Sequence, residues 1–251
     1  MKYNTRFNPT VSGSLHLGHL YVALVNATEA QRSGGKFYLR IDDTQEYWIW
    51  KLGTNITRQL IEGYQQDLKP FIPNFAFELQ SMMPSIEDIA DLKDVPTWAL
   101  RRLLIYEQTP QWVADQTIVL YPYAPILTLE KVLWDFYDGI NWLIRGEDLS
   151  TEFSLYCYFT EMIGVPRIRH TYIPRLVTSQ RQELIDKRKL IDDRRATMSK
   201  TFGSYKIADQ INRFGRDGVI ELLKKSCLID INGEFIVENI KWNPTVVGFE
   251  P

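Results

Sequence analysis

The sequence predicts an α/β protein whose parallel sheet is built in two halves, with a short insertion between them and a small helical segment at the C-terminal end. Two strand–helix–strand patterns lead to this prediction, one within the first 68 residues and one within residues 126–204. Units of this kind build parallel sheets with right-handed crossovers. A chain of 251 residues is also long enough to bury a core without disulfides.

The first pattern is a strand, a turn, a helix and a second strand. Residues 2–7 are typical of a short strand, and the turn formers of 8–14 follow. Over residues 15–32 apolar side chains recur at helical spacing. The sequence Ser-Gly-Gly at 33–35 favours a helix end, and residues 36–41 (KFYLRI) are rich in strand formers. These elements form a βαβ unit.

The polar stretch after the second strand is expected to lead into another helix. Asp42, Asp43 and Thr44 are residue types that cap helices, and the helix itself is predicted over about residues 50–66. Ligands of parallel α/β sheets bind beyond the carboxyl ends of the strands. The loop over residues 8–19 lies at such an end, so we expect functional residues there.

The second half repeats the pattern after a proline-rich middle stretch. We interpret the middle as an insertion with short helices at about 85–92 and 97–107. Beyond it, residues 139–144 read as a strand, 151–163 as a helix and 172–177 as a strand. The tail adds a helix near residues 217–225.

Composition excludes several classes of protein. With 45% hydrophobic and 24% charged residues the chain is not globally disordered, and a net charge of -2 does not suggest strong non-specific binding to nucleic acid. No apolar run approaches the roughly 18 residues of a membrane span, and the N-terminal residues lack the apolar stretch of a signal peptide. The two cysteines, Cys157 and Cys227, argue against a disulfide framework and a structural zinc site. We expect a cytoplasmic protein without a membrane partner.

A histidine pair marks the first helix. His16-Leu17-Gly18-His19 holds two of the three histidines of the chain and falls on the first predicted turn. A helix N-terminus attracts phosphate through its free N–H groups and its dipole. Residues three apart meet on one face, so the imidazoles add donors there, and Gly18 permits close approach of another molecule. Two exposed helix histidines without a role are the alternative.

A second polar motif lies far downstream. In Thr197-Met198-Ser199-Lys200-Thr201 a lysine sits in a loop of mostly small residues, where it can meet a phosphate as a mobile point charge. Such a lysine is uninformative alone. Its place just beyond the second strand–helix–strand pattern makes it a candidate partner of the histidine pair.

The two motifs together resemble the HIGH and KMSKS signatures of class I aminoacyl-tRNA synthetases. The wider sequence resembles the glutamyl-tRNA synthetase branch, whose motifs are similar to four segments of this chain. These segments are residues 5–18 (TRFNPTVSGSLHLG), 34–44 (GGKFYLRIDDT), 143–149 (LIRGEDL) and 166–174 (PRIRHTYIP).

The resemblance implies a Rossmann-type catalytic domain divided by an insertion. On that basis residues 1–68 are the first half of a nucleotide-binding catalytic domain and residues 126–204 the second half. Residues 69–125 form a shortened insertion and residues 205–251 a small helical C-terminal segment.

The resemblance also implies a reaction and its residues. A substrate carboxylate attacks the α-phosphate of ATP, pyrophosphate leaves, and an acceptor takes the acyl group. His16, His19 and Lys200 would be the catalytic residues, and Gly18, Met198 and Ser199 would complete the ATP site. Magnesium would arrive with ATP, and no metal is bound by the chain itself. Thr197 stands where the family has its first KMSKS lysine.

Four further residues match the amino-acid pocket of the glutamyl branch. Arg6 and Arg145 match arginines that contact substrate carboxyl groups. Thr10 and Asp42 match positions near the substrate amino group, where the family prefers glutamate to aspartate. Arg40 and Asp43 are expected to form structural ion pairs instead.

Two departures from the family bear on the substrate. A pocket tyrosine of the family is replaced by Leu127, and an asparagine four residues later is replaced by Lys131. The pocket therefore lacks a hydroxyl that helps to bind the side-chain end of the substrate, and it gains a cation. This change suggests an unusual acid or a different amino acid as substrate.

The acceptor stays open at this point. A glutamate-like amino acid could pass to a nucleoside of tRNA, as in the truncated glutamyl-queuosine tRNA(Asp) synthetases that this core resembles. A small amine, a carrier protein or a modified DNA base are alternatives, as is a catalytically inactive binding module. The short insertion and the 51 residues after Lys200 predict a minimal catalytic core that does not charge tRNA for translation. We expect it to be a monomer.

Overall fold

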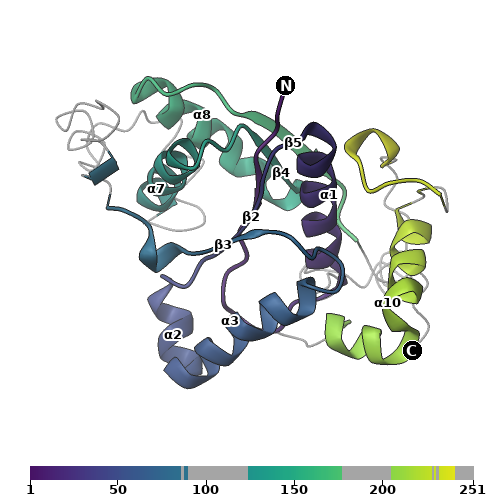
Figure 1. The fold of residues 1–251 in the computed structure, drawn as a ribbon. Helices are drawn as coiled ribbons and strands as arrows, with labels where there is room; N and C mark the ends of the chain where they lie inside the picture. Colours follow the sequence, from purple (N-terminus) through teal and green to yellow (C-terminus); the bar gives the residue numbers. More distant parts are fainter. Residues whose placement is uncertain (86–87, 90–123, 177–204, 228, 230–231, 241–251) are drawn as a thin grey trace, which may run out of the picture.

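The computed structural model describes residues 1–85, 88–89, 124–176, 205–227, 229 and 232–240 (Figure 1). Within this part of the chain, strands occupy the middle of the molecule and helices flank them on both sides. No helix of the described part has the length and apolar character to cross a membrane.

Three parallel strands form the first part of the sheet. These are β1 (Thr5–Phe7), β2 (Phe37–Ile41) and β3 (Ala76–Leu79), with β2 in the middle. Thr5 lies opposite Phe37, and Tyr38 lies opposite Ala76.

Two more parallel strands form a second, two-stranded sheet that lies next to β1. They are β4 (Trp142–Gly146) and β5 (Arg169–Ile173). The backbone N–H groups of Asn141 and Trp142 donate to the Asn4 carbonyl at 3.1 and 3.3 Å, which sets β4 beside β1. The spatial order is therefore β3-β2-β1-β4-β5, as in doubly wound nucleotide-binding folds. The predicted parallel α/β sheet in two halves is confirmed.

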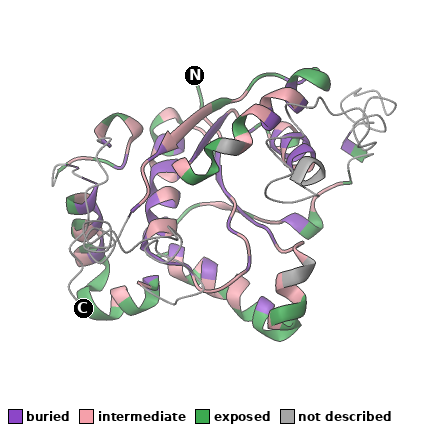
Figure 2. Cartoon of the chain, turned by 180° about the vertical axis from the view of Figure 1, so that it is seen from behind, coloured by how far each residue is buried: buried purple, intermediate pink, exposed green. Residues whose placement is uncertain are grey.

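Helices cover the two faces of this sheet separately (Figure 1). Helices α1 (Leu17–Ser33) and α10 (Ile207–Ser226) lie on one side, and α7 (Ala124–Tyr137) and α8 (Phe153–Met162) lie on the other. Each pair belongs to its own buried apolar cluster. Figure 2 shows the buried residues gathered along the strands and the inner helix faces.

Strand β4 supplies both apolar clusters because successive side chains of a strand point to opposite faces. Trp142 and Ile144 pack in the α1 cluster, whereas Leu143, between them, packs in the α7 and α8 cluster. This strand is buried on both faces, which is typical of a strand inside a parallel sheet.

The helices of the first half differ from the predictions in one respect. α1 is confirmed, and Gly34 ends it in the left-handed conformation (φ 70°). The single helix expected over residues 50–66 is instead two helices, α2 (Glu46–Leu52) and α3 (Thr54–Leu68). Gly53 separates them because its φ of 81° and ψ of 154° lie outside the helical region. No side chain caps α2.

The elements of the second half are present, but their bounds differ by a few residues from those expected. Gly139, with φ 67°, turns the chain after α7, so the strand expected at 139–144 is β4 at Trp142–Gly146. The strand expected at 172–177 is β5 at Arg169–Ile173. The helix expected at 151–163 is a 3-10 helix, η3 (Glu147–Glu152), followed by α8.

The proline-rich middle starts with an element of the sheet. β3 and the 3-10 helix η1 (Gln80–Met82) lie within the stretch interpreted as the insertion. The predicted helix at 97–107 and most of that at 85–92 lie outside the described residues. In the tail, α10 is longer than the expected 217–225 and is kinked at Gly215, and η6 (Val237–Asn239) follows it.

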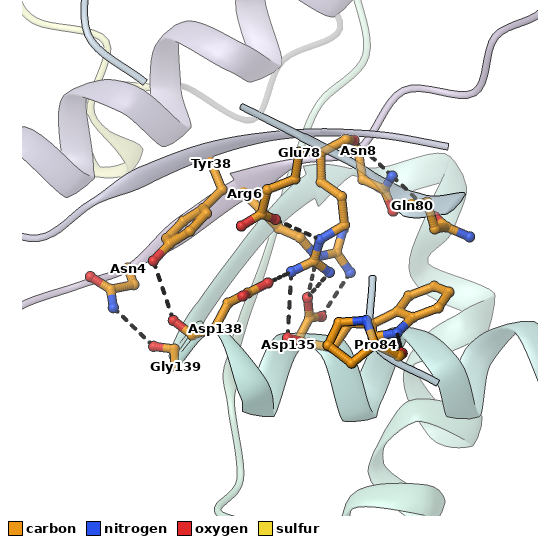
Figure 3. Close-up of polar contacts among 12 residues, drawn as sticks. Asn4, Arg6, Asn8, Tyr38, Glu78, Gln80, Pro84, Asp135, Asp138 and Gly139 are labelled. Carbon is orange, nitrogen blue, oxygen red and sulfur yellow. Dashed lines mark hydrogen bonds and ion pairs between the residues drawn. The ribbon is translucent and has the colours of Figure 1, made fainter. Parts of the chain in front are cut away.

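A buried charge cluster joins β1, β2 and α7 (Figure 3). Arg6 of β1 donates two hydrogen bonds to Asp135 of α7, that from Nη2 at 2.8 Å. Arg40 of β2 donates from Nη1 to the same carboxylate at 2.8 Å and from Nε to Glu78 at 3.1 Å. Arg40 also pairs with Asp138. The expectation of structural ion pairs is confirmed for Arg40. It is wrong for Asp43 within the described part, where this carboxylate instead accepts hydrogen bonds from the backbone N–H and the hydroxyl of Ser81.

The charges of the two arginines determine the ionisation of Asp135. Burial by itself would raise the pKa of this carboxyl, but Arg6 and Arg40 lower the pKa to about 2. The Tyr156 hydroxyl of α8 donates a further hydrogen bond at 2.9 Å. Because the pKa is depressed in the folded state, the cluster stabilises the fold above the ordinary pKa of 3.8 and loses this effect as the pH falls towards 2.

We expect Asp135→Asn to lower the free energy of unfolding by about 3–5 kcal/mol, because it leaves two buried guanidinium groups without their shared anion. Urea unfolding followed by circular dichroism measures the loss. As control, Glu161→Gln breaks the exposed pair with Arg167 and should change the free energy by less than about 1 kcal/mol. Equal small effects of both variants would contradict the structural role of Asp135.

Candidate active site

A cavity of about 550 Å³ opens beyond the carboxyl ends of β1 and β4. Its volume lies within the range of about 300–1,000 Å³ usual for small-molecule sites. The polar and charged residues that line it come from β1 and the loop after it, the start of α1, the loop after β2, α7, β4, η3 and the segment after β5. They are Arg6, Asn8, Thr10, Ser12, His16, His19, Asp42, Gln45, Lys131, Arg145, Asp148, Glu152 and Arg175.

One wall of the cavity is the N-terminus of α1, which the two histidines cap. The Gly18 backbone N–H donates to His16 Nδ1 at 3.1 Å, and the His16 backbone N–H donates to His19 Nδ1 at 3.2 Å. The reciprocal arrangement is a capping box in which imidazoles replace the usual hydroxyl and carboxylate. The sequence analysis predicted the helix N-terminus but not this role.

The capping hydrogen bonds fix the tautomer of both rings. Since each Nδ1 accepts a hydrogen bond from a backbone N–H, a neutral imidazole in this arrangement carries its proton on Nε2. The ring centroids of His16 and His19 lie 3.7 Å apart, and both residues line the cavity with Gly18 between them. Two Nε2–H donors therefore accompany the positive end of the α1 dipole, a combination suited to phosphate.

Two distant segments hold the loop that carries these histidines. The Leu17 N–H donates to the Tyr205 carbonyl at 3.1 Å, and the Ile207 N–H donates to the Leu15 carbonyl at 3.1 Å. The Tyr64 hydroxyl of α3 donates to the carbonyls of Thr10 and Gly13 at 3.1 and 2.5 Å. The chain that follows the predicted lysine motif is thus fastened beside His16.

Asp42 forms an anionic point in the cavity. Its carboxylate accepts hydrogen bonds from the side chains of Gln45 at 2.7 Å, Thr44 at 3.1 Å and Thr10 at 3.3 Å. Asp42 is only 4% exposed, and no Lys or Arg of the described part forms an ion pair with it. A buried carboxylate held by neutral donors keeps its charge available for a cationic ligand group.

A second group of residues in the cavity lining is cationic. Arg145 of β4 donates from Nη1 to Glu152 at 3.1 Å, and its guanidinium lies 5.7 Å from the Tyr156 ring centre. Arg6 also lines the cavity, while its Nε and Nη2 groups each donate a hydrogen bond to Asp135. Lys131 of α7 lies near both arginines and lines the same cavity.

An aromatic layer lies behind Arg145. The ring of His170 on β5 lies 4.8 Å from that of Tyr156 and 5.0 Å from that of Phe153. Burial, followed by the charges of Arg145 and Arg6, lowers the pKa of His170 to about 4, although Asp135 acts in the opposite direction. Its Nδ1 has no hydrogen-bond partner among the described residues.

The structure brings most of the predicted site residues together. Arg6, Thr10, His16, Gly18, His19, Asp42 and Arg145 all line the one cavity. Leu127 lies in the first turns of α7, and the placement of its side chain is outside the description. Met198, Ser199 and Lys200 also lie outside the described residues.

Three residues that pair with side chains of the site were not predicted from the sequence, namely Asp135, Glu152 and Gln45. Asp135 has a local signal, since it follows Lys131 by four positions and so shares its helix face. Cys157 and Cys227 are free thiols, and the described part holds no group of three side chains that could hold a metal ion.

Comparisons with known protein sequences match the N-terminal part of the chain. Residues 2–52 match the family described as tRNA synthetases class I (E and Q), catalytic domain. The glutamate–tRNA ligase 2 of Orientia tsutsugamushi is 58% identical over 40 residues, which are 16% of this chain and 9% of that protein. The glutamate–tRNA ligase of Wigglesworthia glossinidia brevipalpis is 44% identical over 73 residues, or 28% of this chain and 15% of that protein. The matched segments thus span a small share of these relatives.

Solved structures share the fold over a much longer stretch. The glutamate-tRNA synthetase of Elizabethkingia anophelis superposes with a TM-score of 0.53 at 15% identity, covering 100% of this chain and 68% of that one. The tyrosyl-tRNA synthetase of Archaeoglobus fulgidus, complexed with L-tyrosine, gives 0.56 at 16% identity, covering 82% and 61%. At this identity the likeness establishes the fold.

We expect His170 to contribute a loss of stability as the pH drops from about 6.5 to about 4, because it stays neutral in the folded state while it takes up a proton when unfolded. His170→Gln should remove this contribution, so the unfolding free energy of the variant should decline less steeply over that range than that of wild type. Urea titrations at several pH values measure both slopes. Identical slopes would contradict the buried neutral histidine.

Proposed function

We propose that the chain carries a class I synthetase core of the glutamate and glutamine type, which joins an amino acid to ATP as an acyl-adenylate and passes the acyl group to an acceptor. The match of residues 2–52 to that family and the shared fold support the proposal. The observation that carries the proposal is the single cavity that holds both a phosphate-type wall, at His16 and His19, and a charged amino-acid end, at Asp42 and Arg145. We expect glutamate or a related amino acid as substrate.

The first step is a displacement at the α-phosphorus of ATP. An oxygen of the amino-acid carboxylate forms a bond to that phosphorus, the bond to the bridging oxygen of the β-phosphate breaks, and pyrophosphate leaves with the electron pair. Such a step depends on positioning and on stabilisation of the developing negative charge rather than on covalent help from the protein.

The residues of the phosphate wall fit that requirement. The Nε2–H groups of His16 and His19 would donate to phosphate oxygens, while Gly18 leaves room for the nucleotide. We assign Lys200 to the leaving pyrophosphate, with Met198 and Ser199 beside the nucleotide; Tyr205, a little further along the chain, contacts the base of α1. Magnesium would enter on the phosphates of ATP.

The residues of the amino-acid end fit a zwitterion. The ammonium group of the substrate would complete the hydrogen bonding of Asp42, with Thr10 holding that carboxylate in place. The fork of Arg145 would face an anionic group, in competition with Glu152. The α-carboxylate then points towards the histidines, where the phosphorus is attacked.

For the acceptor we propose a tRNA or one of its modified nucleosides, in line with the glutamate–tRNA ligases that the chain resembles. Binding of an RNA should weaken steeply as salt rises, because phosphate contacts release counterions. Filter binding of bulk tRNA between 50 and 300 mM salt tests the proposal. A flat response would favour a small amine, a carrier protein or a modified base, which the sequence analysis left as alternatives.

Exchange of labelled pyrophosphate into ATP tests the activation step. We expect exchange with one amino acid of a full panel, and we expect His16→Asn to lower its rate about 100-fold, as for loss of one charge-stabilising donor. Asparagine keeps a good helix cap in place of Nδ1 but lacks the Nε2 donor.

The fold serves as the control for this variant. His16→Asn should leave the unfolding free energy within about 0.5 kcal/mol of wild type, whereas His16→Ala should lose about 1 kcal/mol through the cap. Exchange that is unaffected by His16→Asn would contradict the phosphate role. No exchange with any amino acid, with or without tRNA, would contradict the activation step.

A further inference from the structure

The cationic end of the cavity holds three basic side chains in different situations. Arg6 forms a two-pronged pair with Asp135, and Arg145 pairs with Glu152 at 3.1 Å. Lys131 lies near both but has no hydrogen bond or ion pair with any other residue that the structure describes. Each of these two arginines thus pairs with a carboxylate of the protein, whereas Lys131 has no such partner among the described residues.

The position of Lys131 follows from the helix that carries it. Lys131 and Asp135 are four residues apart on α7, so both face the sheet, where Arg6 and Arg145 extend from β1 and β4. Asp135 is fully buried, and Lys131 is partly buried with its side chain in the cavity wall. Burial lowers the pKa of Lys131, and Arg145 and Arg6 act in the same direction, against Glu152 and Asp42.

An ammonium group in such a place is costly unless an anion joins it. The described residues supply no carboxylate within 4.0 Å of the Lys131 ammonium group, so a ligand in the cavity can provide the anion. Asp42 in the same cavity shows the opposite case, since it is a buried carboxylate that forms no ion pair with any Lys or Arg of the described ranges. One unpaired charge of each sign complements a ligand that carries an ammonium group and a separate anion.

We propose that Lys131 selects the substrate, by pairing with an anionic group on the side chain of an amino acid whose ammonium group lies at Asp42. Selection then depends on charge. An amide of the same size brings no anion to Lys131 and is rejected, because the buried ammonium would stay unpaired in the complex. The substrate class is therefore an α-amino acid with an acidic side chain. The inference rests on the proposed function for the reaction, but the binding itself needs no ATP.

Calorimetry without ATP tests this selection with two acid–amide pairs, glutamate with glutamine and aspartate with asparagine. Wild type should bind the acid of at least one pair about 30-fold or more tightly than the amide. This factor is at the lower end of the range expected for a buried charge pair. Lys131→Met should weaken binding of that acid by about the same factor and change binding of its amide by less than about 3-fold.

Two further variants control for effects other than charge. Lys131→Arg keeps the charge and should retain most of the preference. Lys36→Met removes an exposed lysine outside the cavity lining and should leave both affinities unchanged. Thermal unfolding of Lys131→Met should match or exceed that of wild type, because an unpaired buried charge is removed; Lys131→Gln serves as a second neutral variant.

An unchanged acid preference in both neutral variants would overturn the assignment of Lys131. Equal binding of acid and amide by wild type in both pairs, or no binding at all, would overturn it too. Failure of the proposed function has a different signature. If wild type selects an acid and Lys131→Met loses that selection while pyrophosphate exchange stays absent, the adenylation reaction fails and the role of Lys131 in selection stands.

Discussion

The pairing of the buried Asp135 carboxylate with Arg6 and Arg40 is the interaction on which the arrangement of the sheet, α7 and the cavity depends. The carboxylate accepts hydrogen bonds from Arg6, Arg40 and Tyr156, and so joins strands β1 and β2 to helices α7 and α8. Two guanidinium groups around one buried anion are tolerated only while that anion stays charged, which the depressed pKa ensures. The cluster thereby fixes α7 against the sheet and sets Lys131, one turn earlier, at the edge of the cavity.

The cavity has two electrostatic ends for two separate reasons. The phosphate-type wall depends on backbone geometry, because the helix start of α1 and its two capping histidines present N–H donors together. The amino-acid end depends on side chains whose internal pairing is unequal: Arg145 has Glu152, whereas Asp42 and Lys131 have no counterion in the described part. A zwitterion with an acidic side chain supplies both missing charges, and the α-carboxylate is left for the phosphate wall.

The sequence predicted the features that depend on local pattern. The helical spacing before Gly34 gave α1, and residues at strand ends such as Thr10 and Asp42 met in the cavity because parallel strands end at one edge. The break at Gly53 escaped prediction since the polar pattern continues across it. The pairing of Arg6 with Asp135 also escaped, because it joins residues far apart in sequence. The roles assigned to Leu127, Met198, Ser199 and Lys200, the monomeric state and the cytoplasmic location stay predictions.

A crystal structure with a non-hydrolysable acyl-adenylate analogue, the sulfamoyl adenosine of the preferred amino acid, tests whether the two ends of the cavity bind the two parts of an acyl-adenylate. We expect the sulfamoyl oxygens to lie within hydrogen-bond distance of Nε2 of His16 or His19, with the ammonium group at Asp42 and the side-chain anion at Lys131. Binding of the analogue outside this cavity, or in it with the ammonium group away from Asp42, would contradict the account.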